Sequence, residues 1–167
     1  MKIQIADQSH LDELLKVAYQ TFVDTYGHLN TPDNLQQYVA ENFTKEALWH
    51  EMQEEGAYFL VGILDGIIVA YAKLRTNEVE FPNRNALEIQ RIYLQKTLHG
   101  LRLGSKMMQA CIDLAKQKGY AEICLGVWEE NPKAIQFYKK WGFEIFDSHP
   151  FVIGEEVQND YLMRKVL

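Results

Sequence analysis

The chain has 167 residues, the size of one ordinary globular domain, and we expect a single domain over residues 1–167. Apolar residues make up 47% of it, which is enough to bury a core and too much for a disordered tail. Lysine and arginine total 17 against 23 acidic residues, a net charge of -6. This balance argues against nucleic acid as a partner and favours a cationic small molecule or peptide, although the same acidity also keeps cytoplasmic proteins soluble.

Two cysteines, Cys111 and Cys124, each lie in an apolar pattern, and we expect both to be core thiols. Because no paired His or Cys residues have the spacing of metal ligands, no metal site is expected. No stretch approaches the roughly 18 apolar residues that span a bilayer, and residues 1–7 lack the features of a secretory signal. We therefore expect a cytoplasmic protein with no membrane partner.

The N-terminal part predicts one strand followed by helices. Residues 1–6 alternate apolar and polar side chains, which is typical of a short strand. Ser9 is the expected cap of a first helix, whose apolar stripe ends near Gly27. Two further short helices are expected, with caps at Thr31 and Thr44.

The middle of the chain predicts antiparallel sheet. Residues 57–64 and 67–74 are rich in β-forming side chains and flank Asp65-Gly66, the strongest short-range signal of a tight hairpin. Residues 76–85 carry the turn-forming residues of a surface loop.

The second half predicts alternating strands and helices. They are a strand over 87–94, a helix over 103–118 that ends at Gly119, a strand over 120–127, a helix over 132–140, and strands over 143–152 and 161–166. The strand, crossover helix and strand over 87–127 form a βαβ unit. The expected fold is α/β (α+β), with a mixed central sheet of about seven strands and helices on both faces.

Residues 99–105 form a glycine-containing turn between a predicted strand and a helix. Unpaired backbone N–H groups at a helix start, together with the positive end of the helix dipole, make a site for a diphosphate. Gly100 and Gly104 allow close approach of the backbone. The loop lacks the residues of a nucleotide P-loop and of a dinucleotide fingerprint. Alone, it is equally consistent with a helix start that binds nothing.

A second motif, Asn-x-x-Ala-x-x-Phe-Tyr-x-x-x-Gly-Phe, covers residues 131–143. Combined with the earlier loop, it resembles the GCN5-related N-acetyltransferase (GNAT) family, and the resemblance covers the whole order of elements. It implies an enzyme that transfers an acetyl group from acetyl-CoA to an amine. Family members separate the strand over 87–94 from that over 123–127 to admit the pantetheine arm.

The cofactor loop departs from the family pattern Gln/Arg-x-x-Gly-x-Gly/Ala, onto which His99, Arg102 and Gly104 fall. Only Gly104 agrees with it, so we expect backbone amides rather than side chains to hold the pyrophosphate. The backbone of residues 92–94 would pair with the pantetheine amides like an added strand. The resemblance implies these cofactor-binding residues: Ile92, Tyr93, Leu94, His99, Gly100, Leu101, Arg102, Leu103, Gly104, Ser105, Asn131, Lys133 and Tyr138.

By the same resemblance, Tyr138 is the catalytic acid that protonates the sulfur of coenzyme A. The alternative is a tyrosine that only packs beside Phe137. Backbone N–H groups of Tyr93 and Leu94 are the expected donors to the thioester carbonyl as charge develops on its oxygen.

Glu88 has the spacing of a catalytic glutamate in some family members. A carboxylate with a pKa near 4.3 is a poor base for an amine, so Glu88 would act through water. Alternatively it binds the positive charge of the substrate, or pairs with Arg91 or Arg75. His99 is a weaker candidate for the base, because its place in the loop directs it toward phosphate.

Three short segments, Glu-Ile-Gln-Arg-Ile-Tyr-Leu among them, resemble a bacterial spermidine/spermine acetyltransferase subgroup and imply a polyamine substrate. Six acidic residues are candidates for attracting it, or are merely solvated: Glu78, Glu80, Glu129, Glu130, Glu155 and Glu156. Five aromatic residues are candidates for a substrate groove, or pack in the core: Phe22, Tyr26, Tyr38, Phe43 and Trp49.

Two alternatives share the same cofactor residues. One is a peptide or protein N-terminal acetyltransferase, and the other is a non-catalytic acyl-CoA-binding sensor on the same scaffold. Exposed strand edges over residues 151–166 also favour pairing across a two-fold axis, which predicts a homodimer.

Overall fold

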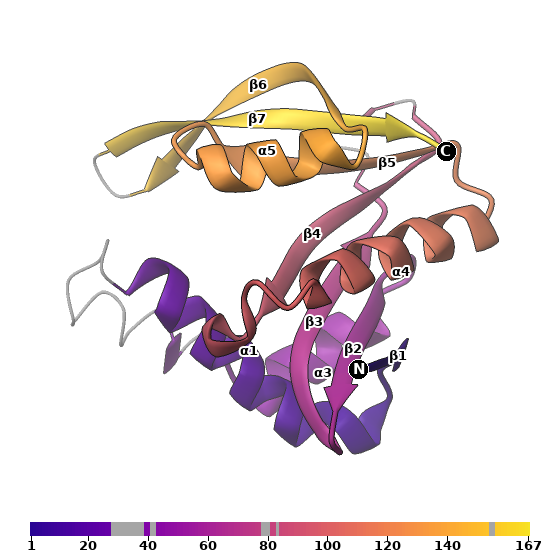
Figure 1. Ribbon diagram of the computed structural model, residues 1–167, viewed down its shortest axis with the longest axis vertical. Coiled ribbons are helices and arrows are strands. Elements are labelled where there is room, and N and C mark those ends of the chain that lie inside the picture. The colour runs from indigo at the N-terminus through magenta and orange to yellow at the C-terminus, as the bar shows by residue number, and fades with distance from the viewer. Residues whose placement is uncertain (28–38, 41–42, 78–80, 83, 154–155) are drawn as a thin grey trace. The chain divides into compact units, whose positions relative to one another are not determined.

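The computed structural model describes residues 1–27, 39–40, 43–77, 81–82, 84–153 and 156–167. A seven-stranded sheet has the strand order β1-β2-β3-β4-β5-β7-β6 (Figure 1). Because β4 and β5 are parallel and the end strands antiparallel, the sheet is mixed, and the predicted fold class is confirmed. The expected helix cap at Thr31 lies outside the described residues.

The chain forms two compact units, each with its own core. The first contains Met1–Arg75 and Arg91–Cys111, and the second contains Thr76–Gln90 and Ile112–Leu167. Strand β4 (Ala86–Leu94) and helix α4 (Leu103–Gln117) each contribute residues to both.

The first unit contains the hairpin that the sequence predicts. The hairpin is formed by β2 (Tyr58–Leu64) and β3 (Ile67–Arg75). The other elements are β1 (Lys2–Ile5), the 3-10 turn η1 (Gln8–His10), α1 (Leu11–Tyr26), α3 (Lys45–Gln53) and the 3-10 turn η2 (Lys96–Leu98). At the turn between β2 and β3, Asp65 and Gly66 have φ values of 51° and 84°. Two consecutive positive φ values match the twist of the flanking strands, so the hairpin is confirmed.

The start of the first helix differs from the prediction. Ser9 is not the cap: Asp7 caps the 3-10 turn η1, because its carboxylate accepts hydrogen bonds from both the backbone N–H and the hydroxyl of Ser9, and the N-cap of α1 is His10, whose side chain makes no capping hydrogen bond. Ser9 therefore acts as a donor within η1, and α1 begins only at Leu11. The predicted end at Gly27 and the predicted cap at Thr44 are both confirmed, since Thr44 accepts from the N–H of Ala47 at 3.1 Å.

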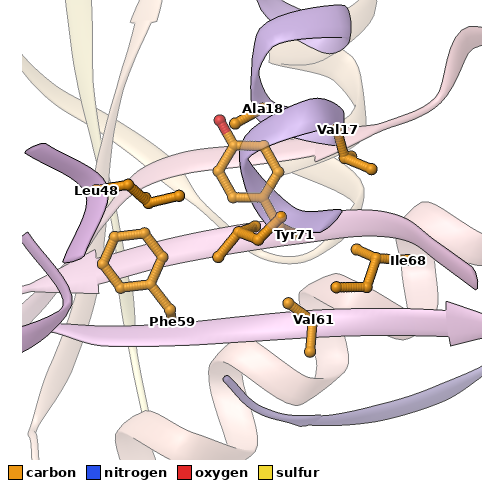
Figure 2. Close-up of a cluster of buried hydrophobic side chains, with 8 residues drawn as sticks. Val17, Ala18, Leu48, Phe59, Val61, Ile68 and Tyr71 are labelled. Atoms are coloured by element: carbon orange, nitrogen blue, oxygen red, sulfur yellow. The ribbon is translucent and has the colours of Figure 1, made fainter. Parts of the chain in front are cut away.

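Helices α1 and α3 cover one face of the β2-β3 hairpin. Figure 2 shows the cluster, in which α1 contributes Val17 and Ala18, α3 contributes Leu48, and the strands contribute Phe59, Val61, Ile68 and Tyr71, all buried. On the opposite face of β2, a Cβ added at Gly62 would lie 3.1 Å from the sulfur of Met107 in α4. Since successive strand residues point to opposite faces, helices pack on both faces of β2, as predicted.

The second unit is built around β5. Its elements are the first part of β4, β5 (Glu122–Trp128), α5 (Pro132–Lys140), β6 (Glu144–Ile153) and β7 (Glu156–Val166). Strand β7 pairs with β5 on one side and β6 on the other. The predicted edge over residues 151–166 is therefore wrong for β7, because both of its sides are paired; the edge strand is β6.

A second hydrophobic cluster contains Phe81, Ala86, Cys124 and Leu162. Phe81 lies in the segment predicted to be a surface loop, so that prediction is wrong at this residue: its ring is buried against Phe146. Cys124 and Cys111 are buried free thiols, and burial raises the pKa of each to about 12. Both are core thiols, as predicted.

None of the helices in the described residues is long and apolar enough to cross a membrane.

The importance of the first core can be tested with two adjacent isoleucines of β3. Ile68 is 0% exposed and Ile67 is 56% exposed. Ile68→Ala should lower the free energy of unfolding by about 2–5 kcal/mol, because it leaves a cavity, whereas Ile67→Ala should change it by less than about 0.5 kcal/mol. Urea denaturation of both variants provides the measurement. Equal losses would contradict the assignment of Ile68 to the core.

Candidate functional site

The predicted site residues fall in both compact units, and each set is described within its own unit. The first unit contains the end of β4 and the loop before α4. The second contains Glu88 and helix α5.

The loop over residues 99–105 has the backbone of an anion-binding turn. Gly100 and Arg102 have φ values of 86° and 59°, and α4 begins at Leu103. The first turn of α4 carries no acidic side chain that would repel a phosphate. A Cβ added at Gly100 or Gly104 would meet no atom within 4 Å, so the backbone borders open space. These features fit a diphosphate held by backbone N–H groups.

Arg102 occupies a left-handed conformation that favours glycine. Its φ is 59°. In the family pattern, the first glycine stands at this position. A side chain in this region costs roughly 1–2 kcal/mol because Cβ approaches the following carbonyl oxygen. The loop therefore keeps the backbone path that glycine normally provides, with an exposed arginine side chain added.

The side chain of His99 contacts the strand before the loop. Its Nε2 lies 3.1 Å from the carbonyl oxygen of Leu94, and the tautomer with a hydrogen on Nε2 donates to that oxygen. From the sequence, we expected this ring to point toward the phosphate. In the structure it contacts the carbonyl of Leu94, one of the backbone groups predicted to pair with the cofactor.

Three other contacts hold the end of β4. The ring of Tyr93 stacks on that of Tyr71, with centroids 5.7 Å apart and an interplanar angle of 29°. The N–H of Gln95 donates to the carbonyl of Val69 at 2.9 Å. Arg91 donates to both carboxylate oxygens of Glu51, at 2.9 and 3.3 Å. The segment predicted to bind pantetheine is thus fixed at both of its ends.

Glu51 is part of a charged network that the sequence did not indicate. It also accepts from the Nζ of Lys73 at 2.7 Å, and Lys73 is 4% exposed. Burial by itself raises the pKa of the Glu51 carboxyl, but hydrogen bonds and charge from Lys73 and Arg91 outweigh burial and hold this pKa below its usual value. The three residues lie 22 and 40 positions apart in the chain, so no local pattern could reveal their contact.

In the second unit, Glu88 is a buried carboxylate. It is 8% exposed and accepts a hydrogen bond from the side-chain amide of Asn77 at 2.9 Å. Asn77 was missed because it lies in the segment predicted as a surface loop, as its second residue. Of the two arginines proposed as partners, Arg91 bonds to Glu51.

The parallel pairing of β4 with β5 covers only the start of β4. Ala86, Leu87 and Glu88 pair with Glu122, Ile123 and Cys124, and both strands continue beyond the last pair. Glu88 therefore stands at the end of this ladder.

Helix α5 carries the second motif. Asn131 is its N-cap and accepts from the N–H of Ala134 at 3.1 Å. The side-chain oxygen is thus used within the helix, which leaves the amide NH₂ group as the donor that could meet a cofactor. Lys133 in the first turn is exposed.

Tyr138 lies on α5 with its ring between two other aromatic rings. Its centroid is 5.6 Å from that of Phe137 and 5.9 Å from that of Phe143. The ring is half-buried. Packing beside Phe137 therefore occurs, and it is compatible with an acid role because it orients the phenol without using its hydroxyl.

The two sets proposed for the acceptor are only partly described. Glu130 is exposed, and Glu129 accepts from the side chain of Asn159 at 3.3 Å. Phe43 packs against the first core and contacts Phe22 with centroids 5.1 Å apart, as expected for core packing. Trp49, on α3, is half-buried. Six members lie outside the described side chains: Tyr26, Tyr38, Glu78, Glu80, Glu155 and Glu156.

Comparison with known proteins identifies the class. The family model for the acetyltransferase (GNAT) family matches residues 16–143. The chain therefore belongs to this family, and it is an N-acetyltransferase with acetyl-CoA as its cosubstrate.

Individual relatives and a solved structure resemble the chain along most of its length. The chain is 31% identical over 169 residues to an uncharacterized N-acetyltransferase of Lactobacillus delbrueckii subsp. lactis, covering 100% of this chain and 98% of that one. It is 24% identical to the spermidine N(1)-acetyltransferase of Thermoplasma acidophilum, covering 88% of each chain. The crystal structure of the PaiA N-acetyltransferase of T. acidophilum in complex with coenzyme A has the same fold, with a TM-score of 0.77, 24% identity and full coverage of both chains.

The left-handed backbone at residue 102 can be tested by comparing Arg102→Gly with Arg102→Ala. Both lose the arginine side chain, but only glycine relieves the conformation, so Arg102→Gly should be more stable than Arg102→Ala by about 1 kcal/mol. At Lys106, inside α4, the order should reverse, because glycine weakens a helix relative to alanine. Thermal denaturation of the four variants measures both differences. The same order at both positions would contradict the left-handed conformation.

Proposed function

We propose that this chain acetylates a primary amine of a polyamine, such as spermidine or spermine. The observation that carries this choice of acceptor is the match, along 88% of both chains, to a relative named a spermidine N(1)-acetyltransferase. The net charge of -6 also favours a polycationic substrate. Glu88 supports the proposal because a buried carboxylate on β4 can bind a cationic amine.

In this proposal, acetyl-CoA is bound mainly by backbone groups. The N–H and C=O groups of Ile92, Tyr93 and Leu94 pair with the pantetheine amides, and the N–H groups of residues 100–105 bind the pyrophosphate. The amide of Asn131 donates to the cofactor arm, and the exposed ammonium of Lys133 is placed to meet its negative charge. The cosubstrate supplies the thioester, and the residues of this chain supply position, charge and protons.

Three groups divide the proposed chemistry. Glu88 accepts the proton of the substrate ammonium through water, since an ordinary carboxylate is too weak a base to take it directly. The N–H groups of Tyr93 and Leu94 stabilise the negative charge on the thioester oxygen during direct attack by the amine. Tyr138 then donates its phenolic proton to the departing sulfur. A new N–C bond replaces the S–C bond. The nitrogen then loses a second proton, which restores the phenol of Tyr138, and the net proton of the reaction leaves through Glu88.

The acceptor can be tested with a panel of spermidine, spermine, amino acids and peptides with free N-termini, with release of coenzyme A as the readout. We expect turnover on spermidine and spermine at micromolar to millimolar concentrations. Turnover on peptides alone would replace the polyamine with a peptide N-terminus. Calorimetric binding of acetyl-CoA without turnover on any amine would instead indicate an acyl-CoA sensor.

The role of Tyr138 can be tested with Tyr138→Phe, which removes the hydroxyl and keeps the ring that packs on Phe137 and Phe143. kcat should fall about a hundredfold, the usual contribution of a general acid, while the Kd for acetyl-CoA should be nearly unchanged. Tyr120→Phe removes the same group from the loop after α4 and serves as the control. Equal kcat values for the two variants at saturating substrates would eliminate Tyr138 as the acid.

A further inference from the structure

The end of β4 is anchored to helix α3 by charge. Arg91 directly precedes Ile92, the first residue of the proposed pantetheine-binding segment. Its guanidinium makes two hydrogen bonds, at 2.9 and 3.3 Å, to the two oxygens of Glu51 on α3. Such a bidentate contact restricts both the distance between the partners and their orientation, whereas a single hydrogen bond restricts mainly the distance.

The same carboxylate already has another cation. Lys73 on β3 is 4% exposed, and its ammonium lies 2.7 Å from Glu51 and 3.6 Å from Glu54. A buried ammonium requires such compensation, because removing it from water is costly. The Lys73–Glu51 pair therefore satisfies the two most buried charges of the network without Arg91.

Arg91 itself does not need the pair in order to be solvated. Its side chain is 33% exposed, so the guanidinium can reach water. We therefore explain the contact of Arg91 with Glu51 by its effect on the backbone position of β4. The contact links β4 to α3 one residue before the segment proposed to pair with the cofactor. The stacking of Tyr93 on Tyr71 and the contact of His99 with the carbonyl of Leu94 hold the same segment at later residues.

We propose that Glu51 and Arg91 are positioning residues for acetyl-CoA. They hold the backbone of Ile92–Leu94 in the extended geometry that receives the pantetheine amides, so the cofactor does not have to order this segment when it binds. The inference rests on the proposed pairing of pantetheine with residues 92–94. It assigns to an ion pair that touches no substrate an effect on the affinity for the cofactor, and a smaller effect on the chemical step through the N–H groups of Tyr93 and Leu94.

A second ion pair provides a matched control. Arg84 in the second unit bonds to Glu122 at 2.8 Å, and Glu122 also has a second cation, Arg164, at 3.4 Å. The exposed fractions are similar: 29% and 17% for Arg84 and Glu122, against 33% and 21% for Arg91 and Glu51. Arg84 precedes β4 and has no part in the proposed binding of cofactor.

The experiment compares Arg91→Gln with Arg84→Gln in the full chain. Calorimetric titration gives the Kd for acetyl-CoA, steady-state kinetics gives kcat and the KM for the amine, and thermal denaturation gives stability. Arg91→Gln should bind acetyl-CoA about tenfold more weakly, through lost preorganisation, with the amine KM close to wild type and a fall in kcat no larger than the loss of affinity. Arg84→Gln should lose similar stability and keep its affinity. Arg91→Lys retains the positive charge but not the bidentate contact, so it should recover only part of the affinity for acetyl-CoA.

Equal affinities of the two glutamine variants for acetyl-CoA would overturn the inference, as would a loss confined to kcat. If Arg91→Gln does not fold, Arg91→Lys and Arg84→Lys make the same comparison with the charges retained. Titration of the wild-type protein with acetyl-CoA distinguishes failure of this inference from failure of the proposed function. A wild type that binds acetyl-CoA but acetylates no polyamine leaves the inference standing and removes only the proposed acceptor.

Discussion

Backbone hydrogen bonding along β4 is the constraint on which the candidate site depends. Its first three residues form a parallel ladder with β5, and its last residues are held by side-chain contacts from Glu51, Tyr71 and His99. Strand β4 is also hydrogen-bonded to its other neighbour, β3. In the proposed binding of acetyl-CoA, backbone groups of Ile92–Leu94 pair with pantetheine like an added strand, and the side chains that fix this segment help to set the position of those groups.

The loop after β4 is the proposed site for the pyrophosphate. Binding there depends on where the backbone N–H groups point, and two positive φ values, at Gly100 and Arg102, set those directions. Glycine reaches such values without strain, and arginine reaches them at a cost. The departure of Arg102 from the family pattern is therefore compatible with binding, because the backbone path is kept even though the residue type is not.

Two carboxylates, the half-buried Glu51 and the buried Glu88, have hydrogen-bond donors of different kinds. Glu51 lies between two cations, which lower its pKa and commit it to ion pairing. Glu88 has a neutral donor, the amide of Asn77. An amide orients a carboxylate by donating a hydrogen bond to it, which fits the role in binding the acceptor that is proposed for Glu88.

Much of the fold could be read from the sequence, because its signals are local. The periodicity of α1 and α4, the Asp65-Gly66 turn and the cap at Thr44 act within a few residues, and the structure confirms them. The cofactor loop and the motif over residues 131–143 are also local, which is why they were sufficient to indicate an acetyltransferase. Even among local signals, competition decided one detail: Asp7 caps a 3-10 turn that contains Ser9, so Ser9 does not cap the helix that follows.

Only the tertiary structure decided which distant side chains meet. The contact of Glu51 with Lys73 and Arg91, the burial of Phe81 and the hydrogen bond from Asn77 to Glu88 join residues 11 to 65 positions apart. Sheet order likewise placed β7 between two strands rather than at an edge. Such contacts depend on the path of the whole chain, whereas the sequence by itself determined the elements and the chemical groups they carry.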